Sequence, residues 1–457
     1  MSSQGVDQLS FDFLPQLPVI VQPSAGQLSS DAGLLPLRQF DQRWAYTARM
    51  AHCLHDPKPS RQHTLLSMLR QRIFGILAGY EDCNDHDTLR DDPVFKLIAD
   101  RLPEDDALAS QPTLSRFENL ATPAVLHQLI NFNITTGIER LKQKHGGKLP
   151  ASITLDLDAT DDPTHGHQQL TLFHGYFGQY QYFPLIISEP TTKHIFLAWL
   201  RPGTVHASLG ADEDLMRVVN ALRKERPDIA IHVRADAGFG NPRMYEVCEE
   251  NGLTYTFGFS SNARLKKLTE NLMQQAVDGY GQSKQKQRLF DCLEYRCDTW
   301  DRSRTVVAKA ECHEQGTNLR FVVSNLPGTT TAEHARKLYD DYTQRGESEQ
   351  RMDEMKNGLH MDRLSCHRFM ANFFRLLEHV AAFNLLNAMR DSVQLPPALR
   401  LGQPCSWRIY VIKVAATIVQ TSRRILVKLA GNWPWWPLYQ SAAQRAFIAN
   451  SILLCGP

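Results

Sequence analysis

The chain has 457 residues, of which 42% are hydrophobic and 22% are charged, and its net charge is +1. This length allows two to four structural units with buried cores. The small net charge excludes a histone-like protein that is basic all over, but not an enzyme with a local basic patch. No signal peptide and no run of about 18 apolar residues occur, so we expect a cytoplasmic protein without a membrane partner.

The first 150 residues divide into an irregular arm and a helical region. Residues 1–35 contain no Lys or Arg and are rich in Pro, Gly, Ser and Gln, which predicts an irregular N-terminal arm. Residues 36–150 carry apolar residues at helical spacing, and Asp92-Pro93 and Pro112 are typical helix starts. Two short helices, the second bearing Arg116, suit a helix-turn-helix DNA reader. A plain helical pair is the open alternative.

The periodicity changes to that of strands near residue 152. Residues 153–158 alternate apolar and polar side chains. The expected elements that follow are strands at 169–174, 182–188 and 194–200, a helix at 212–226, a strand at 229–235, a helix from Asn241 to Gly252, and a strand at 253–259. This order predicts an α/β fold with a mixed sheet, namely the ribonuclease-H-like fold.

The second half of the chain continues this pattern after an interruption. Residues 263–330 predict a β-rich insertion, with strands at 293–297, 305–310 and 319–324. Helices are expected from 331 to 390 and again from 405 to 429. From residue 401 onward there are six Lys or Arg residues and no acidic residue, giving +6. Arg423 and Arg424 in this basic segment suit phosphate contact, and a solvated helix face is the alternative.

Two strands end in aspartates, which are depleted inside strands. Asp156 and Asp158 have the same parity and therefore project from one face of the first strand. Asp236 ends a later strand and is followed by Gly238 and Gly240, which allow close approach of backbone or DNA. Such positions at strand ends are typical of functional sites.

A third acid is predicted by the segment YTQRGESEQRMDEMK. Its residues Tyr342, Arg345, Glu349 and Lys356 fall within an arc of about 60° if one helix continues through Gly346. One face would then combine an aromatic ring, two cations and an acid, which suits phosphate binding beside a metal ligand. The alternative is an ordinary ion pair between Arg345 and Glu349.

The residue types indicate the chemistry. Asp158, Asp236 and Glu349 form a hard oxygen set that suits Mg²⁺ or Mn²⁺. Two ions about 4 Å apart can activate a water or a 3′-hydroxyl for attack on a phosphodiester. The chain has no GxxxxGK[ST] loop, so no nucleotide cofactor is expected.

The Tyr-x2-Arg-x3-Glu-x6-Lys spacing resembles the YREK signature of bacterial insertion-sequence transposases of the DDE class. The segments LDLDATDDPTHGHQQ, VRADAGFGNPRMYEVCEENG and LSCHRFMANFFRLLEHVAAFNLL resemble one family of that class, and the similarity runs from about residue 28 to the end. The resemblance implies a catalytic domain at 151–262 and 331–395, split by the insertion at 263–330. It implies a DNA-end-binding region at 36–150 and a basic helical region at 396–457.

The resemblance also implies residue roles. Asp158 matches the first acid, with Asp156 as the alternative, and Asp236 and Glu349 match the second and third. Tyr342, Arg345 and Lys356 match residues that contact the ends of the mobile element. The implied reaction is nicking at terminal inverted repeats followed by transfer of 3′-hydroxyl ends into double-stranded target DNA. Relatives act as homodimers in a synaptic complex.

Overall fold

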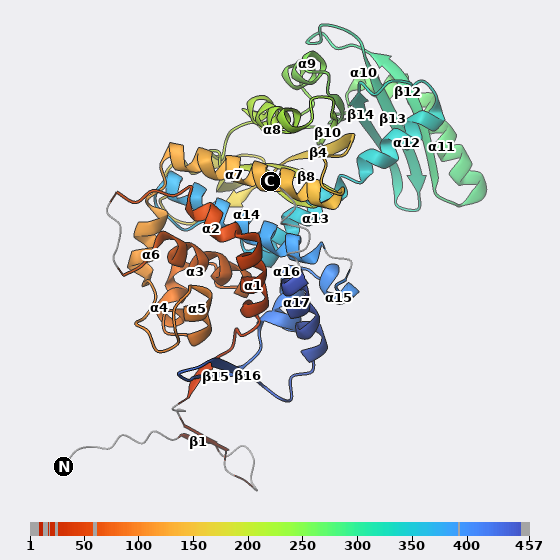
Figure 1. The fold of residues 1–457 in the computed structure, drawn as a ribbon. Coiled ribbons are helices and arrows are strands. Elements are labelled where there is room, and N and C mark those ends of the chain that lie inside the picture. The colour runs from red at the N-terminus through yellow and green to blue at the C-terminus, as the bar shows by residue number, and fades with distance from the viewer. Residues whose placement is uncertain are drawn as a thin grey trace, which may run out of the picture.

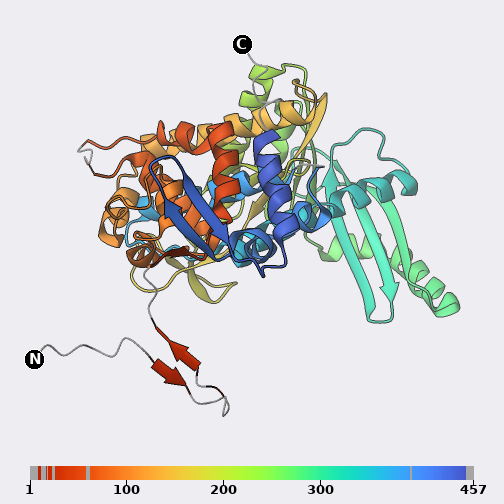
Figure 2. The same ribbon diagram turned by 60° about the horizontal axis from the view of Figure 1, so that its bottom comes forward.

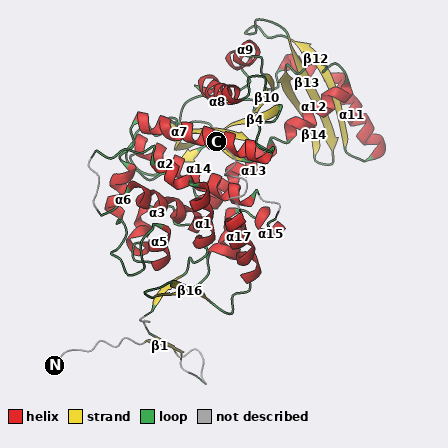
Figure 3. Ribbon diagram, viewed as in Figure 1, coloured by secondary structure: helices red, strands yellow, loops and turns green. Residues whose placement is uncertain are grey.

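The structure is a computed structural model of the chain, and it describes residues 9–11, 17, 19–22, 26–57, 62–391 and 394–448. A helical body forms one part of the molecule, and most strands gather in the other part (Figure 3). The longer helices of the body are α1 (Leu34–Trp44), α3 (Leu65–Ala78), α7 (Pro123–Lys144) and α14 (Phe369–Arg390).

The central sheet has eight strands in the order β12-β13-β14-β11-β10-β4-β8-β9. Its first five strands along the chain are β4 (Ser152–Ala159), β8 (Leu185–Glu189), β9 (His194–Trp199), β10 (Ala230–Ala235) and β11 (Thr254–Phe259). Strands β4, β8 and β9 are antiparallel neighbours, whereas β10 and β11 continue the sheet parallel to β4. In spatial order this is third, second, first, fourth, fifth, the ribonuclease-H-like arrangement, so the predicted fold class is confirmed.

Helices cover both faces of this sheet. Helices α8 (Ala211–Glu225) and α9 (Pro242–Glu250) lie on one side, and α13 (Gly346–Asp353) and α14 lie on the other (Figure 1). Coverage of both faces explains why the central strands are buried on both sides. Leu155, Leu157 and Val233 on one face have no exposed surface, and Asp156 and Arg234 on the opposite face are 0% and 2% exposed.

A second, smaller sheet lies between β4 and β8 in the sequence. Its strands are β5 (Asp162–Pro163), β6 (Leu172–His174) and β7 (Gln179–Tyr182), in the order β5-β7-β6. The strand predicted at 169–174 is therefore shorter than expected and lies outside the central sheet. Strand β7 was not predicted, because Gly175 and Gly178 interrupt the apolar pattern around it.

The insertion extends the central sheet rather than forming a separate one. Strands β12 (Gln287–Tyr295), β13 (Arg304–His313) and β14 (Gly316–Ser324) are successive antiparallel neighbours, and β14 pairs with β11. They project from one side of the molecule with α11 (Glu270–Ser283) and α12 (Ala332–Thr343) packed on them (Figure 1). Helices α10 (Ala263–Leu268) and α11 were not predicted, since α11 is polar and contains two glycines.

The described part of region 36–150 is helical, as predicted, and its two candidate helices are a plain helical pair rather than a helix-turn-helix. Helix α5 (Pro93–Ile98) begins at the Asp92 cap, and α6 (Gln111–Glu118) begins next to Pro112, as the sequence predicted. Residues 99–110 separate the two helices, whereas a helix-turn-helix has a turn of about 3–4 residues. The helix-turn-helix interpretation is therefore wrong, and α6 buries its apolar face against α3 and α14.

The helix predicted at 405–429 is also wrong over most of its length. Helical geometry covers α16 (Pro404–Trp407) and the following π-turn Arg408–Ile412. Beyond it, β15 (Ala416–Gln420) and β16 (Ile425–Leu429) form a hairpin that pairs with β3 (Gln27–Ser29) of the predicted irregular arm (Figure 2). Both hairpin strands are rich in β-branched and large aliphatic residues, which favour strands. The chain then forms α17 (Trp436–Ile448) against α1.

Two further findings concern the described residues only. None of the described helices is long and apolar enough to cross a membrane. The eight cysteines in the described ranges are all free thiols, and half of them are only partly buried.

Candidate active site

Asp158 lies near the end of β4, and Asp236 directly follows the neighbouring parallel strand β10. Strand β10 pairs with β4 in a register that places Arg234 opposite Asp156 and Ala235 opposite Leu157. The next pair in this register is Asp236 and Asp158, on strands about 4.8 Å apart. The chain thus brings two acids that are far apart in the sequence to one position at the carboxyl ends of β4 and β10.

Asp158 is buried and ion-paired. Its Oδ1 accepts a hydrogen bond of 2.8 Å from Nη1 of Arg345. Burial raises the pKa of Asp158 to about 6; Arg345 opposes this rise and the negative charge of Asp236 adds to it. The positive charge of Arg345 therefore only partly offsets the effect of burial on the ionised carboxylate.

Asp156 has a different environment, although it shares a face with Asp158. It is completely buried, and its two oxygens accept hydrogen bonds from Nε of Arg234 at 2.8 Å and from Nη2 of Arg351 at 2.6 Å. Arg234 and Arg351 are themselves only 2% exposed. Asp156 of β4 therefore forms buried ion pairs with Arg234 of β10 and Arg351 of α13, which link the three elements.

The segment that carries the third acid is not one continuous helix. Helix α12 ends at Thr343 and α13 begins at Gly346. Between them, the amides of Gln344 and Arg345 donate to carbonyls three residues earlier, as in a tight 3₁₀ turn. The predicted arc was calculated for an ideal helix and is therefore only approximate, but the turn keeps Arg345 directed toward the sheet.

Arg345 is the centre of the charged groups at this edge. Its Nη1 binds Asp158, and its Nη2 binds Oε1 of Glu349 at 3.0 Å. Burial lowers the pKa of Arg345, but Asp158 and the other nearby acids, Asp236 and Glu349, outweigh burial and raise it above its ordinary value. One guanidinium thus faces all three predicted acids. The side chain of Glu349 is 70% exposed and remains open to solvent.

Lys356 lies beside this group but binds a different acid. Its Nζ donates to Oδ1 of Asp161 at 2.6 Å, from the π-turn Glu354–Gly358 that follows α13. Although burial raises the pKa of Asp161, the bond to Lys356 lowers it below its ordinary value. Lys356 is therefore held close to Asp158, because its partner Asp161 is only three residues further along the chain.

The carboxylate oxygens of Asp158, Asp236 and Glu349 are the kind of ligand that a hard divalent cation prefers. The acids offer only oxygen donors, and a positively charged group already lies among them. Oδ2 of Asp158 is buried and, like the nearby Oγ of Ser348, makes no well-aligned hydrogen bond to a described residue. No group of three acidic, His or Cys side chains within the described ranges is already arranged around a common metal position.

Three residues that shape this edge were missed from the sequence: Gly258, Ser348 and Asp161. A Cβ at Gly258, in β11, would lie 2.8 Å from the hydroxyl of Tyr342 and 2.7 Å from the amide nitrogen of Ala237. Only glycine therefore allows Tyr342 to approach the backbone next to Asp236. A lone glycine inside a strand pattern is the signal that was available. Ser348 and Asp161 gave no comparable signal.

The remaining predicted DNA-binding residues lie elsewhere. Arg116 is exposed on α6 and donates to the Thr113 hydroxyl. Arg423 and Arg424 are exposed at the tip of the β15–β16 hairpin, where the Arg424 amide donates to the hydroxyl of Thr421. None of the three belongs to an element that carries the predicted acids.

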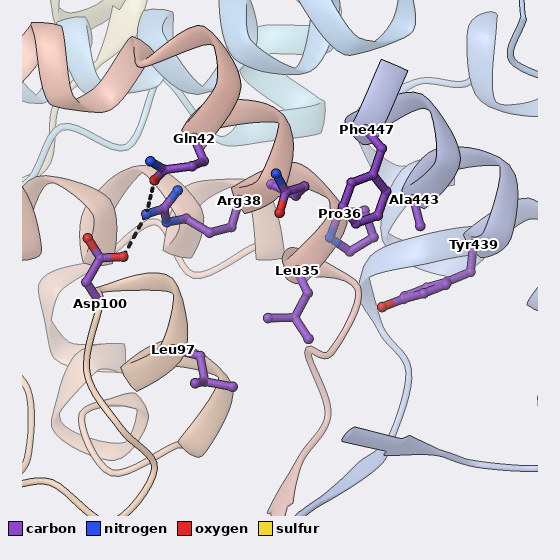
Figure 4. Close-up of a pocket in the computed structure, with 10 residues that line it drawn as sticks. Leu35, Pro36, Arg38, Gln42, Leu97, Asp100, Tyr439, Ala443 and Phe447 are labelled. Carbon is purple, nitrogen blue, oxygen red and sulfur yellow. Dashed lines mark hydrogen bonds and ion pairs between the residues drawn. The ribbon is translucent and has the colours of Figure 1, made fainter. Parts of the chain in front are cut away.

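The carboxylate edge is also distinct from a pocket of about 400 Å³ between α1 and α17. Leu35 and Pro36 of α1 face Tyr439 and Phe447 of α17 across it, and Arg38 binds Asp100 and Gln42 at one side (Figure 4). Its lining residues come from none of the elements that carry the acids.

The chain was compared with curated proteins, solved structures and protein-family models. No match was found among curated proteins. Among solved structures, a piggyBac transposase synaptic complex with hairpin DNA is similar at 12% identity, over 80% of this chain and 77% of that chain, with a TM-score of 0.38. A family model described as transposase DDE domain group 1 matches residues 12–449. Since this match covers nearly the entire sequence, the chain belongs to the group 1 family of DDE transposase domains.

Proposed function

We propose that this DDE transposase is the active enzyme of a bacterial insertion sequence, and that it nicks the ends of the element and transfers them into target DNA. The observation that carries the proposal is the convergence of Asp158, Asp236 and Glu349 around Arg345. Asp158 lies on β4, Asp236 directly follows β10 and Glu349 lies on α13, and this proximity of three acids distant in the sequence supports the proposal.

We propose Asp158, rather than Asp156, as the first of the three acids. Both carboxylate oxygens of Asp156 already accept hydrogen bonds from buried arginines, which disfavours Asp156 as a metal ligand. Asp158 retains one oxygen without a well-aligned hydrogen bond, and Asp236 lies next to it. Asp156 then acts in stability and not in chemistry.

Asp158, Asp236 and Glu349 would hold Mg²⁺ or Mn²⁺, as two ions in the complex with DNA. When bound, the ions would activate a water or a DNA 3′-hydroxyl and stabilise the leaving oxygen of the phosphodiester. The protein supplies the fixed position of its carboxylates. Burial of Asp158 between β8, β10 and α13 holds its side chain in one place before DNA arrives.

The cations beside the acids would bind the DNA backbone. Arg345 can donate two parallel hydrogen bonds to a phosphate once the acids are neutralised by metal. Lys356 on the π-turn and the hydroxyl of Tyr342 lie on the same segment and would contact the end of the element. Arg116, Arg423 and Arg424 would contact DNA further from the cleaved bond, in a homodimer that acts on chromosomal DNA in the cytoplasm.

The test is a cleavage assay on supercoiled plasmid that carries the inverted repeats flanking the gene. With Mg²⁺, the wild-type protein should nick the repeat ends and give joined products. Asp236→Asn should abolish nicking while keeping end binding in a gel-shift assay. Asp228→Asn is the matched control, because Asp228 is exposed, precedes the same strand and pairs only with Arg226 among described residues.

Each outcome of the assay points to a different class of protein. End binding without any nicking by the wild type would favour a repurposed DNA-binding protein. Nicking without joined products would favour a nuclease. Nicking by Asp236→Asn would show that the proposed acids are not the site.

A further inference from the structure

An exposed aromatic hairpin lies beside the candidate active site. We define it as residues 170–182, which comprise β6, β7 and the tip between them. Six large apolar side chains of this segment are exposed by 39% or more, namely Leu170, Leu172, Phe173, Tyr176, Phe177 and Tyr180. Tyr176 at the tip is 87% exposed. Single exposed apolar residues are ordinary, but a cluster of this kind is typical of an interaction surface.

The rings of the hairpin are held in fixed positions. Phe173 and Tyr180 are direct cross-strand partners, with ring centroids 5.5 Å apart. Phe177 packs against His174 at 4.9 Å and against Phe183 at 6.1 Å. Such rings lose little conformational freedom when a partner binds, since their geometry is already set.

Strand β7 of the hairpin is held at both of its ends, and one of these contacts is to a residue close to Asp158. Asp161, three residues after Asp158, binds both Lys356 and Nε2 of Gln179 in β7. At the other end, the hydroxyl of Tyr182 donates to the carbonyl of Gln169, and Asn372 of α14 donates to the same hydroxyl. The hairpin is thus anchored at both ends of β7, whereas Tyr176 in the tip remains exposed.

The chemistry of this surface selects its partner. Residues 163–188 contain no Asp, Glu, Lys or Arg. The electrostatic attraction of phosphate comes from Lys and Arg, which this segment lacks, whereas the face of a nucleobase is uncharged and stacks on Tyr and Phe. Base faces are covered inside a duplex, so the bases that fit here are unpaired ones.

We propose that the aromatic hairpin stacks on unpaired bases of the DNA strand next to the cleavage site. This inference rests on the proposed function, because it assigns the uncharged part of the same DNA interface. Lys356 and Arg345 would bind the backbone on one side of Asp161, and the rings of Tyr176, Tyr180 and Phe173 would hold the exposed bases on the other.

The experiment compares binding of two DNA ends to full-length Asp236→Asn protein, which does not depend on cleavage. One DNA carries the repeat end fully paired, and the other has three unpaired nucleotides at the cleavage site. We expect tighter binding of the unpaired end, by roughly 10-fold for each stacked base. The double variant Tyr176→Ala/Tyr180→Ala should lose this preference and bind the paired end as before, whereas Tyr176→Phe/Tyr180→Phe should keep it.

A second measurement distinguishes base stacking from self-association of the protein. Light scattering without DNA measures the oligomeric state: a double Ala variant that loses self-association would show that the hairpin is a contact between protein chains and overturn the inference. A preference for unpaired ends that survives in the double Ala variant would overturn it as well. Failure of the proposed function is detected separately, as absence of nicking by the wild type in the plasmid assay.

Discussion

Replacing Asp156 with Asn should destabilise the protein strongly, although the change is isosteric. Asp156 is completely buried and binds two arginines that are each 2% exposed. The amide of Asn cannot balance either guanidinium, so Arg351 would lose its buried counter-charge and Arg234 would keep only the half-exposed Asp341 at 3.7 Å. Removing one partner of a buried ion pair costs about 3–5 kcal/mol.

The matched variant Asp158→Asn should behave in the opposite way. The pKa of Asp158 is raised from 3.8 to about 6, chiefly by burial, so the folded state disfavours its ionised form. A rise of about 2 pKa units corresponds to about 3 kcal/mol at neutral pH. Asn removes that cost while losing the bond to Arg345, which keeps Glu349 as a partner. We therefore expect equal or greater stability together with loss of DNA cleavage.

Thermal unfolding at pH 7.5 measures both variants. A change of 1 kcal/mol shifts Tm by about 2–4 °C for a unit of 150–250 residues, so Asp156→Asn should lower Tm by about 10 °C. Plasmid nicking, measured below the Tm of each variant, should survive in Asp156→Asn and vanish in Asp158→Asn. An Asp156→Asn protein with wild-type Tm but no nicking would refute the assignment of the two residues.

Three further predictions concern pH, packing and DNA binding. Below pH 3.8 Asp158 is protonated in both the folded and the unfolded state. As pH rises through 6, the wild type should lose up to about 3 kcal/mol of unfolding free energy relative to Asp158→Asn. Urea melts that give the same difference in unfolding free energy between the two proteins at pH 4 and pH 7 would contradict this. Gly258→Ala should reduce nicking at least 10-fold, because its Cβ would lie 2.8 Å from the Tyr342 hydroxyl and force that ring away; wild-type kinetics would argue against the role of this contact. Lys356→Ala should reduce the slope of log binding constant against log salt by about 1, and an unchanged slope in salt titrations would exclude a phosphate contact.

Much of the catalytic half was predictable because its signals are local. Alternation of apolar and polar residues gave the strands β4, β10 and β11, and Asn241-Pro242 gave the start of α9. These features depend on neighbouring residues, which a sequence displays directly. The errors fall where tertiary context decides, as at 416–429, which is long enough for a helix but becomes a hairpin because β3 is available as a partner.

The sequence by itself predicted the three acids that we propose, and it correctly predicted that Asp158 and Asp236 stand at the ends of strands. Parity alone did not separate Asp158 from Asp156, because it places both on one face of β4, and the preference for Asp158 came from the resemblance. Only the tertiary structure separates their environments: Arg234 and Arg351 enclose Asp156, while Arg345 leaves one oxygen of Asp158 without a well-aligned bond. The physical reason is that burial and counter-charge come from residues that are distant in the chain, and these fix whether a carboxylate stabilises the fold or remains available as a ligand.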